Sequence, residues 1–169
     1  QGGTYDDYIR HCISKMSHLF CTSTQAGIFN VERLGEERWR IIQSGLLSYD
    51  DMGSIREKDK QKIINKFELT DKFIIILATM HPITLDLEKT KNESREFFNA
   101  LKKVSRKYDT KIFITSPNSD NGCELIKKII KESIKEMEDA IFVESLGGFQ
   151  YQTLMSLTNS RKVIVCGNS

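Results

Sequence analysis

Polar or glycine-rich segments follow four short apolar runs of the sequence, and they hold the side chains best suited to acid–base and ligand-binding chemistry. The runs are residues 73–78, 111–115, 141–144 and 163–166, and the segments after them are 79–82, 116–122, 145–148 and 167–169. If the runs are parallel strands of one sheet, their carboxyl ends meet at one edge, where such sheets bind ligands. The sequence therefore predicts a cleft for a polar ligand at that edge.

His81 is the strongest candidate for proton transfer in these segments. It directly follows the run 73–78, and Pro82 biases it towards an extended backbone. An imidazole titrates near neutral pH, so His81 could act as a general acid or a general base. A histidine with only a structural role in the loop is the alternative.

The other strand-end segments each allow two interpretations. Asn118 and Asp120 could contact a ligand, or they could be turn and helix-capping residues. Gly147 and Gly148 could let backbone N–H groups approach a phosphate, or they could form a plain strand-to-helix turn. The segment 167–169 stands where the start of another helix is expected.

A second polar group lies in the first turns of the first predicted helix, at Asp6, Asp7, Arg10 and His11. One interpretation is a carboxylate general base with cationic groups beside it. The alternative is helix capping and compensation of the helix dipole by the acids. His11 and His18 are seven positions apart with no carboxylate or thiolate on their face, so no metal site is expected.

The spacing of apolar residues predicts the elements that position these groups. Helices are predicted at 5–17, 25–34, 55–67, 92–108, 121–137 and 149–158, and strands at 19–23, 39–43, 73–78, 111–115, 141–144 and 163–166. This alternation predicts the α/β class, with a Rossmann-like parallel sheet covered by helices on both faces. The run 73–78 is apolar at every position and is predicted as a central strand. Residues 45–54 lack an apolar period and are predicted as a linker between two lobes.

Composition excludes several classes of protein. The net charge of +2 comes from interleaved Lys and Glu, so a nucleic-acid partner is not expected. The longest apolar run is too short to cross a bilayer, so no membrane partner is expected. The cysteines form no CxxC pair, and Cys12, Cys21 and Cys166 lie in apolar stretches. We therefore expect these three to be buried free thiols in a reducing, cytoplasmic compartment.

Four motifs resemble those of hydrolysing UDP-N-acetylglucosamine 2-epimerases. Residues 6–19, DDYIRHCISKMSHL, are similar to that family's DDSIRHAITKLSHL segment. Residues 80–84, MHPIT, resemble its HPVT segment, and residues 116–122, SPNSDNG, its PNxDxG loop. Residues 167–169, GNS, resemble the start of its GNSSxG loop. The His-Pro pair favours the hydrolysing branch, because the non-hydrolysing enzymes carry His-Arg-Arg-Glu there.

The resemblance implies a fold of glycosyltransferase-B type, with two Rossmann-like lobes. Residues 1–44 would be the end of the first lobe, 45–54 the linker and 55–169 the first half of the second lobe. The family's Gly-Gly-Glu segment and the remainder of the second lobe are expected outside these residues. The chain is therefore expected to be a fragment lacking both ends and to be inactive alone.

The resemblance also implies a reaction on UDP-N-acetylglucosamine. A base removes the proton at sugar C2 while UDP leaves from C1, and water then adds to the glycal. The products are N-acetylmannosamine and UDP, at the entry to sialic acid synthesis. No cofactor is expected, and the family commonly forms homo-dimers or homo-tetramers.

Individual roles follow from the matched motifs. The resemblance assigns catalytic roles to Asp7, for proton chemistry, and to His81, at the cleft, with support from Arg10 and His11. It assigns ligand binding to Asn118 and to the phosphate- and uridine-contacting loop formed by Gly167, Asn168 and Ser169.

Two other functions share the same sequence features. A nucleotide-sugar glycosyltransferase would have similar polar strand ends and would transfer the sugar to an acceptor. A non-catalytic module would bind the nucleotide sugar without turnover.

Overall fold

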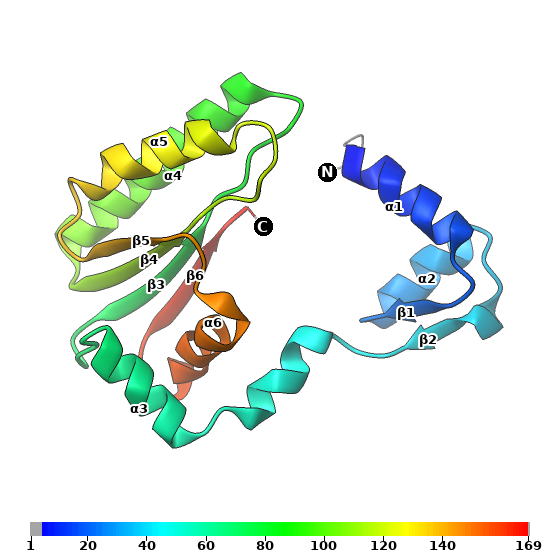
Figure 1. Ribbon diagram of the computed structural model, residues 1–169, viewed down its shortest axis with the longest axis horizontal. Helices are drawn as coiled ribbons and strands as arrows, with labels where there is room; N and C mark the ends of the chain where they lie inside the picture. Colours follow the sequence, from blue (N-terminus) through cyan, green and yellow to red (C-terminus); the bar gives the residue numbers. More distant parts are fainter. Residues whose placement is uncertain (1–4, 169) are drawn as a thin grey trace. The chain divides into compact units, whose positions relative to one another are not determined.

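The computed structural model describes residues 5–168, which form two compact units (Figure 1). The first unit comprises residues 1–54 and the second comprises residues 55–169. The second unit holds the larger sheet.

The sheet of the second unit has four strands, β3 (Ile74–Thr79), β4 (Thr110–Thr115), β5 (Ala140–Val143) and β6 (Val163–Gly167). Their order is β5-β4-β3-β6, and every neighbouring pair is parallel. β3 pairs with β4 on one side and with β6 on the other, and its four middle residues are buried. The predictions of a parallel sheet and of a central strand near residues 73–78 are both confirmed.

Helices cover both faces of this sheet (Figure 1). Residues of β3 alternate between two cores, as expected for a strand buried on both sides. Ile76 and Ala78 pack with residues of α4 (Leu87–Lys107) and α5 (Cys123–Ile134). Ile75 and Leu77 pack with residues of α3 (Glu57–Lys66) and α6 (Gly147–Ser156). The α/β class and the two covered faces are thereby confirmed.

Two element boundaries differ from the sequence prediction. α4 begins at Leu87, before the predicted residue 92, because the Asp86 side chain accepts a hydrogen bond from the Lys89 N–H at 2.8 Å. This N-cap precedes a polar first turn, which has no apolar period to reveal it. Trp39, predicted in a strand, lies in the 3-10 helix η1 (Arg38–Arg40), and the strand after it is β2 (Ile41–Gln43).

The first unit is built around a small core. It contains α1 (Tyr5–Met16), β1 (Phe20–Thr22), α2 (Gln25–Arg33), η1, β2 and the 3-10 helix η2 (Leu47–Ser54). β1 and β2 are parallel, and buried Phe20, Ile28 and Ile41 pack together with half-buried Val31. The predicted linker 45–54 thus contains η2.

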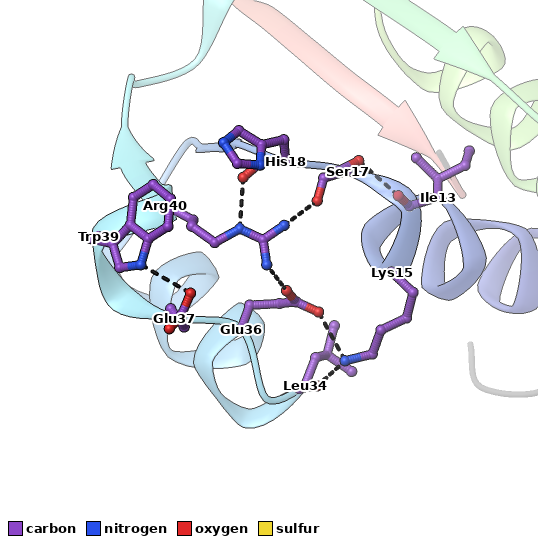
Figure 2. Close-up of polar contacts among 9 residues, drawn as sticks. All are labelled: Ile13, Lys15, Ser17, His18, Leu34, Glu36, Glu37, Trp39 and Arg40. Carbon is purple, nitrogen blue, oxygen red and sulfur yellow. Dashed lines mark hydrogen bonds and ion pairs between the residues drawn. The ribbon is translucent and has the colours of Figure 1, made fainter.

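Polar contacts attach the end of α1 to the segment that precedes β2 (Figure 2). The Glu36 carboxylate accepts hydrogen bonds from Lys15 Nζ and from Arg40 Nη1, each at 2.8 Å. Arg40 also donates from Nε to the His18 carbonyl at 2.7 Å and from Nη2 to the Ser17 carbonyl. The Glu36 side chain is only 7% exposed, whereas the Lys15 side chain is 57% exposed and that of Arg40 19%.

The prediction of buried thiols is wrong for Cys12 and Cys21, which are exposed, and Cys166 is only partly buried. Side chains alternate along β1, so Cys21 points away from the face that buries Phe20 and Thr22. The apolar residues near Cys12, such as Ile13, are themselves exposed. An apolar stretch therefore did not imply a core position. All four cysteines are free.

Candidate active site at the carboxyl edge of the sheet

The carboxyl ends of β3, β4 and β6 meet at one edge of the second unit. Thr79 at the end of β3 lies in register with Thr115 of β4 and with Gly167 of β6. The Thr79 and Thr115 hydroxyls are hydrogen-bonded at 2.6 Å. The chain runs from β3 outward through β4 and β5, then returns to place β6 on the other side of β3. The strand order thus reverses between β3 and β6, the position at which open α/β sheets bind ligands.

His81 is held across this reversal by a single carboxamide. The His81 backbone N–H donates to Asn168 Oδ1 at 2.7 Å, and Asn168 Nδ2 donates to the His81 carbonyl at 2.8 Å. Both backbone polar groups of His81 are therefore satisfied by Asn168, which directly follows β6. The structure brings together two residues that the sequence placed after different strands.

The loop after β4 is the third segment that contributes to this cluster, after those that hold His81 and Asn168. The Asn118 backbone N–H donates to His81 Nδ1 at 3.1 Å. The Asn118 side chain turns within its own loop, where Nδ2 donates to Asp120 Oδ2 at 2.5 Å. The main chain of Asn118, more than its side chain, contacts the imidazole.

Two glycines allow these loops to approach one another. Gly167 has a φ of +150°, and a Cβ atom there would collide with the Thr79 carbonyl oxygen. Gly122, at the start of α5, has a φ of +100°, and a Cβ atom there would lie 3.0 Å from Pro82 Cβ. Any residue other than glycine would be strained at both positions. The close packing of the β3 and β6 ends and of Pro82 against α5 therefore depends on glycine.

A hollow of about 350 Å³ lies beside the cluster, lined by Thr79, Tyr151, Val165, Cys166 and Gly167. Burial raises the pKa of the Tyr151 hydroxyl and that of the Cys166 thiol. Both groups are therefore neutral near pH 7 and offer hydrogen bonds, not charge. Thr79 belongs to the strand-end segment 79–82 that the sequence predicted at this edge, whereas Tyr151, in the helix that follows the Gly147-Gly148 pair, was missed.

Gly147 and Gly148 begin α6, and no atom lies within 4 Å of a Cβ built on either residue. The Gly147 N–H donates to Ser145 Oγ at 3.0 Å, so a side chain already engages this N–H. The turn is open to solvent in the described structure.

Asp7, Arg10 and His11 belong to the first unit and lie on α1. Their spacing of three and four residues places them on one side of the helix. Asp7 is half-buried, whereas Arg10 and His11 are exposed. Ser169 lies outside the described residues, and so does the side chain of Asp6.

The described part of the chain contains neither a cluster of metal ligands nor a membrane-spanning helix. Among the side chains that the structure describes, no three from His, Cys, Asp or Glu gather as a metal site would require. No described helix is long and apolar enough to cross a membrane.

The sequence profile of one family, described as UDP-N-acetylglucosamine 2-epimerase, matches residues 1–169. The chain belongs to the UDP-N-acetylglucosamine 2-epimerase family. The resemblance carried by the four motifs is thereby confirmed.

Curated members of this family are similar over nearly the whole chain. The GDP/UDP-N,N'-diacetylbacillosamine 2-epimerase (hydrolyzing) of Campylobacter jejuni is 32% identical, over 99% of this chain and 42% of its own length. The UDP-N-acetylglucosamine 2-epimerase of Neisseria meningitidis serogroup B is 28% identical, over 99% of this chain and 41% of its own length. The chain thus spans about two-fifths of the length of these 2-epimerases.

A solved 2-epimerase has the same fold. The crystal structure of UDP-GlcNAc 2-epimerase from Neisseria meningitidis bound to UDP-GlcNAc matches 98% of this chain and 42% of its own, with a TM-score of 0.57 and 15% identity. This match confirms that the chain is part of a fold of glycosyltransferase-B type.

Proposed function

We propose that these residues are part of a longer hydrolysing 2-epimerase that converts UDP-N-acetylglucosamine to N-acetylmannosamine and UDP. The observation that carries the proposal is the His81 cluster, at the strand reversal of a chain that matches the epimerase family throughout. Ligands of open α/β sheets bind at this position.

The proposed reaction has two balanced steps. In the first, a base takes the proton from C2, the electrons of that C–H bond form the C1–C2 double bond, and the C1–O bond breaks. The electron pair of the C1–O bond leaves with UDP. In the second step, the electrons of the C1–C2 double bond take up a proton at C2, on the face opposite to the one that lost its proton. The oxygen of water bonds to C1, and that water gives up a proton. Only proton transfers and one leaving group are needed, so the proposal includes no cofactor.

The proposed catalytic residues are those that match the family's motifs. Asp7 is the carboxylate of the proton chemistry, and Arg10 and His11 support it from the same helix. His81 acts at the carboxyl edge of the sheet in the second unit.

The loop residues have the proposed role of ligand binding. Asn118 lies beside the imidazole of His81. Gly167, Asn168 and Ser169 follow β6, at the edge where a diphosphate would bind.

A second candidate substrate is UDP-N,N'-diacetylbacillosamine. The relative named for this sugar is 32% identical to the chain, against 28% for the relative named for UDP-N-acetylglucosamine. The two sugars differ in their substituents, whereas both reactions begin with loss of the C2 proton. The same chemistry therefore serves either substrate.

We also propose how the longer protein is divided into lobes. Residues 1–44 are the end of its first lobe, residues 45–54 the linker and residues 55–169 the first half of its second lobe. A homo-dimer or homo-tetramer in the cytoplasm is part of the same proposal. Four free thiols are consistent with a reducing compartment.

Proton NMR in D₂O tests the proposal. The whole protein is incubated with either UDP-sugar, and the 169-residue chain is incubated in parallel. We expect the whole protein to release UDP and a free sugar epimerised at C2 that carries deuterium there, which is N-acetylmannosamine when the substrate is UDP-N-acetylglucosamine. We expect the chain alone to release none. Transfer of the sugar to an acceptor, without free N-acetylmannosamine, would instead indicate a glycosyltransferase. UDP binding without turnover of either sugar would indicate a non-catalytic module.

A further inference from the structure

The contacts of His81 define which of its ring nitrogens carries the proton. In a neutral imidazole one nitrogen bears hydrogen and the other accepts a hydrogen bond. Nδ1 faces the Asn118 backbone N–H at 3.1 Å, and a backbone N–H can only donate. Nδ1 is therefore the acceptor, and the ring proton lies on Nε2.

We infer that His81 is held as the Nε2–H tautomer and serves as a hydrogen-bond donor to an anionic oxygen of the ligand. We further infer that Asn118 and Asn168 are the residues that position it. The identity of the ligand rests on the proposed function, whereas the tautomer rests on the contacts alone.

The surroundings hold the ring and its loop in this arrangement. Asn168 binds both the N–H and the carbonyl of His81, which fixes the backbone from which the ring projects. The hydrogen bond from Asn118 to Asp120 constrains the loop that presents the Asn118 N–H. A ring turned by 180° would place a carbon against that N–H and leave it without its acceptor. The loop after β4 thus selects one ring orientation, on a backbone that the loop after β6 holds.

This tautomer assigns hydrogen-bond donation to His81 and proton abstraction to another residue in the proposed reaction. An Nε2–H group has no lone pair with which to take a proton from sugar C2, so His81 is not the base of the first step. Its ring is partly exposed, and none of the described side chains or backbone groups is hydrogen-bonded to Nε2. A donor there suits the oxygen that gains negative charge when UDP leaves. Proton abstraction is then left to a carboxylate.

The nitrogen-15 spectrum of the imidazoles tests the tautomer in the chain itself. The sequence has only three histidines, and the signal lost in His81→Gln assigns His81. At about pH 8, where a free imidazole is neutral, we expect Nδ1 of His81 at the shift of an unprotonated nitrogen and Nε2 at that of a protonated one. His11 is exposed and serves as the internal reference for a ring that averages both tautomers. A protonated Nδ1, or averaging equal to that of His11, would overturn the inference.

Variants of the positioning residues test how the tautomer is maintained. Asn168→Ala removes both contacts to the His81 backbone, and Asp120→Ala removes the acceptor that holds the Asn118 side chain. We expect each to move the His81 nitrogen shifts towards those of His11. Ser119→Ala, at an exposed position of the same loop, is the control and should leave them unchanged. Unchanged shifts in Asn168→Ala, with a native amide spectrum, would refute the positioning role of Asn168.

Turnover by the whole protein tests the donor role. His81→Gln keeps an N–H donor of similar reach, whereas His81→Glu offers a proton acceptor and no donor. We expect His81→Gln to retain at least about 10-fold more turnover than His81→Glu, because loss of one such donor costs about 10²-fold or more. Equal turnover or the reverse order would overturn the donor role. No turnover by the unmodified protein would contradict the proposed function, while the nitrogen-15 result would still decide the tautomer.

Discussion

At the scale of single residues, the candidate site consists of polar groups from three loops that converge on His81. Asn168 holds its backbone, and Asn118 holds its ring through a main-chain N–H. The side chain that the sequence singled out for acid–base work is therefore the one that the surrounding loops position. Contacts thus reach His81 from the loops after two other strands, β4 and β6.

Removing the imidazole tests that interpretation. In the whole protein, His81→Ala should lower turnover by about 10²-fold or more, the usual contribution of a positioned acid–base or donor group. Steady-state release of UDP measures the effect. Ser119→Ala in the neighbouring loop should retain normal turnover, which controls for changes near the site. Turnover of His81→Ala close to normal would assign His81 a structural role only.

The close approach of β6 to β3 gives a second prediction at this scale. Gly167→Ala should lower the free energy of unfolding by about 1–3 kcal/mol, because its Cβ atom collides with the Thr79 carbonyl. Gly148→Ala is the matched control, since no atom lies within 4 Å of a Cβ there. Urea unfolding of the two variants and of the unmodified chain measures the difference. Equal stability of Gly167→Ala and Gly148→Ala would contradict the close approach.

Some residues of the site could be predicted from the sequence and others could not. His81, Asn118 and Asn168 follow apolar runs, and the geometry of parallel sheets then places them at one edge. The main-chain N–H that fixes the imidazole has no sequence signature, because every residue except proline carries one. Tyr151 was missed because it faces the hollow from within a helix, not from a strand end.

At the scale of elements, the position of α1 depends on contacts between residues about twenty positions apart. Glu36 accepts hydrogen bonds from Lys15 on α1 and from Arg40 in η1, as Figure 2 shows. The alternation of strand and helix was predictable because it depends on local apolar spacing. These polar contacts could not be predicted, because charged residues about twenty positions apart give no periodic signal. The group Asp7, Arg10 and His11 is carried by α1, so the contacts of Glu36 bear on the proposed chemistry.

The Glu36 contacts predict a pH dependence. Hydrogen bonding from Lys15 is the main cause that lowers the pKa of Glu36 below its usual 4.5, and the nearby charges of Lys15 and Arg40 add to it. A carboxyl group whose pKa is lower in the folded state stabilises the fold above its unfolded pKa. That stabilisation disappears as the pH falls through the lower, folded value.

Replacing this carboxylate tests the prediction. Glu36→Gln should be less stable than the unmodified chain at pH 7, and the difference should shrink as the pH is lowered below about 4.5. Urea unfolding at a series of pH values measures it. Glu37→Gln is the control, because the Glu37 carboxylate accepts from Trp39 Nε1 and does not contact α1. A stability difference independent of pH would show that the Glu36 charge does not contribute.

At the scale of the whole molecule, the chain contains separate cores that share no residue. The first unit buries Phe20, Ile28 and Ile41, whereas the second has one core on each side of its sheet. The sequence predicted the larger sheet well because its strands are apolar on both faces. It predicted the first unit less well, because strands of three residues are too short to show a period.

Separate cores predict that the two units lose structure separately. Leu77 is fully buried in the second unit, between α3 and α6 on one side of the sheet. Leu77→Ala should lower the stability of that unit by about 2–5 kcal/mol, and amide hydrogen exchange should accelerate in β3, β4 and β6. Exchange in β1 and β2 should stay unchanged, since Leu77 has no part in their core.

The reciprocal variant is Ile28→Ala, at a residue only 1% exposed in the core of the first unit. It should accelerate exchange in β1 and β2 alone. Hydrogen exchange reports the opening of each region separately, so both variants can be followed in the same experiment. Acceleration throughout the chain in either variant would mean that the two units unfold as one. In that case the stability of α1, and of the residues it carries, would depend on the sheet that holds His81.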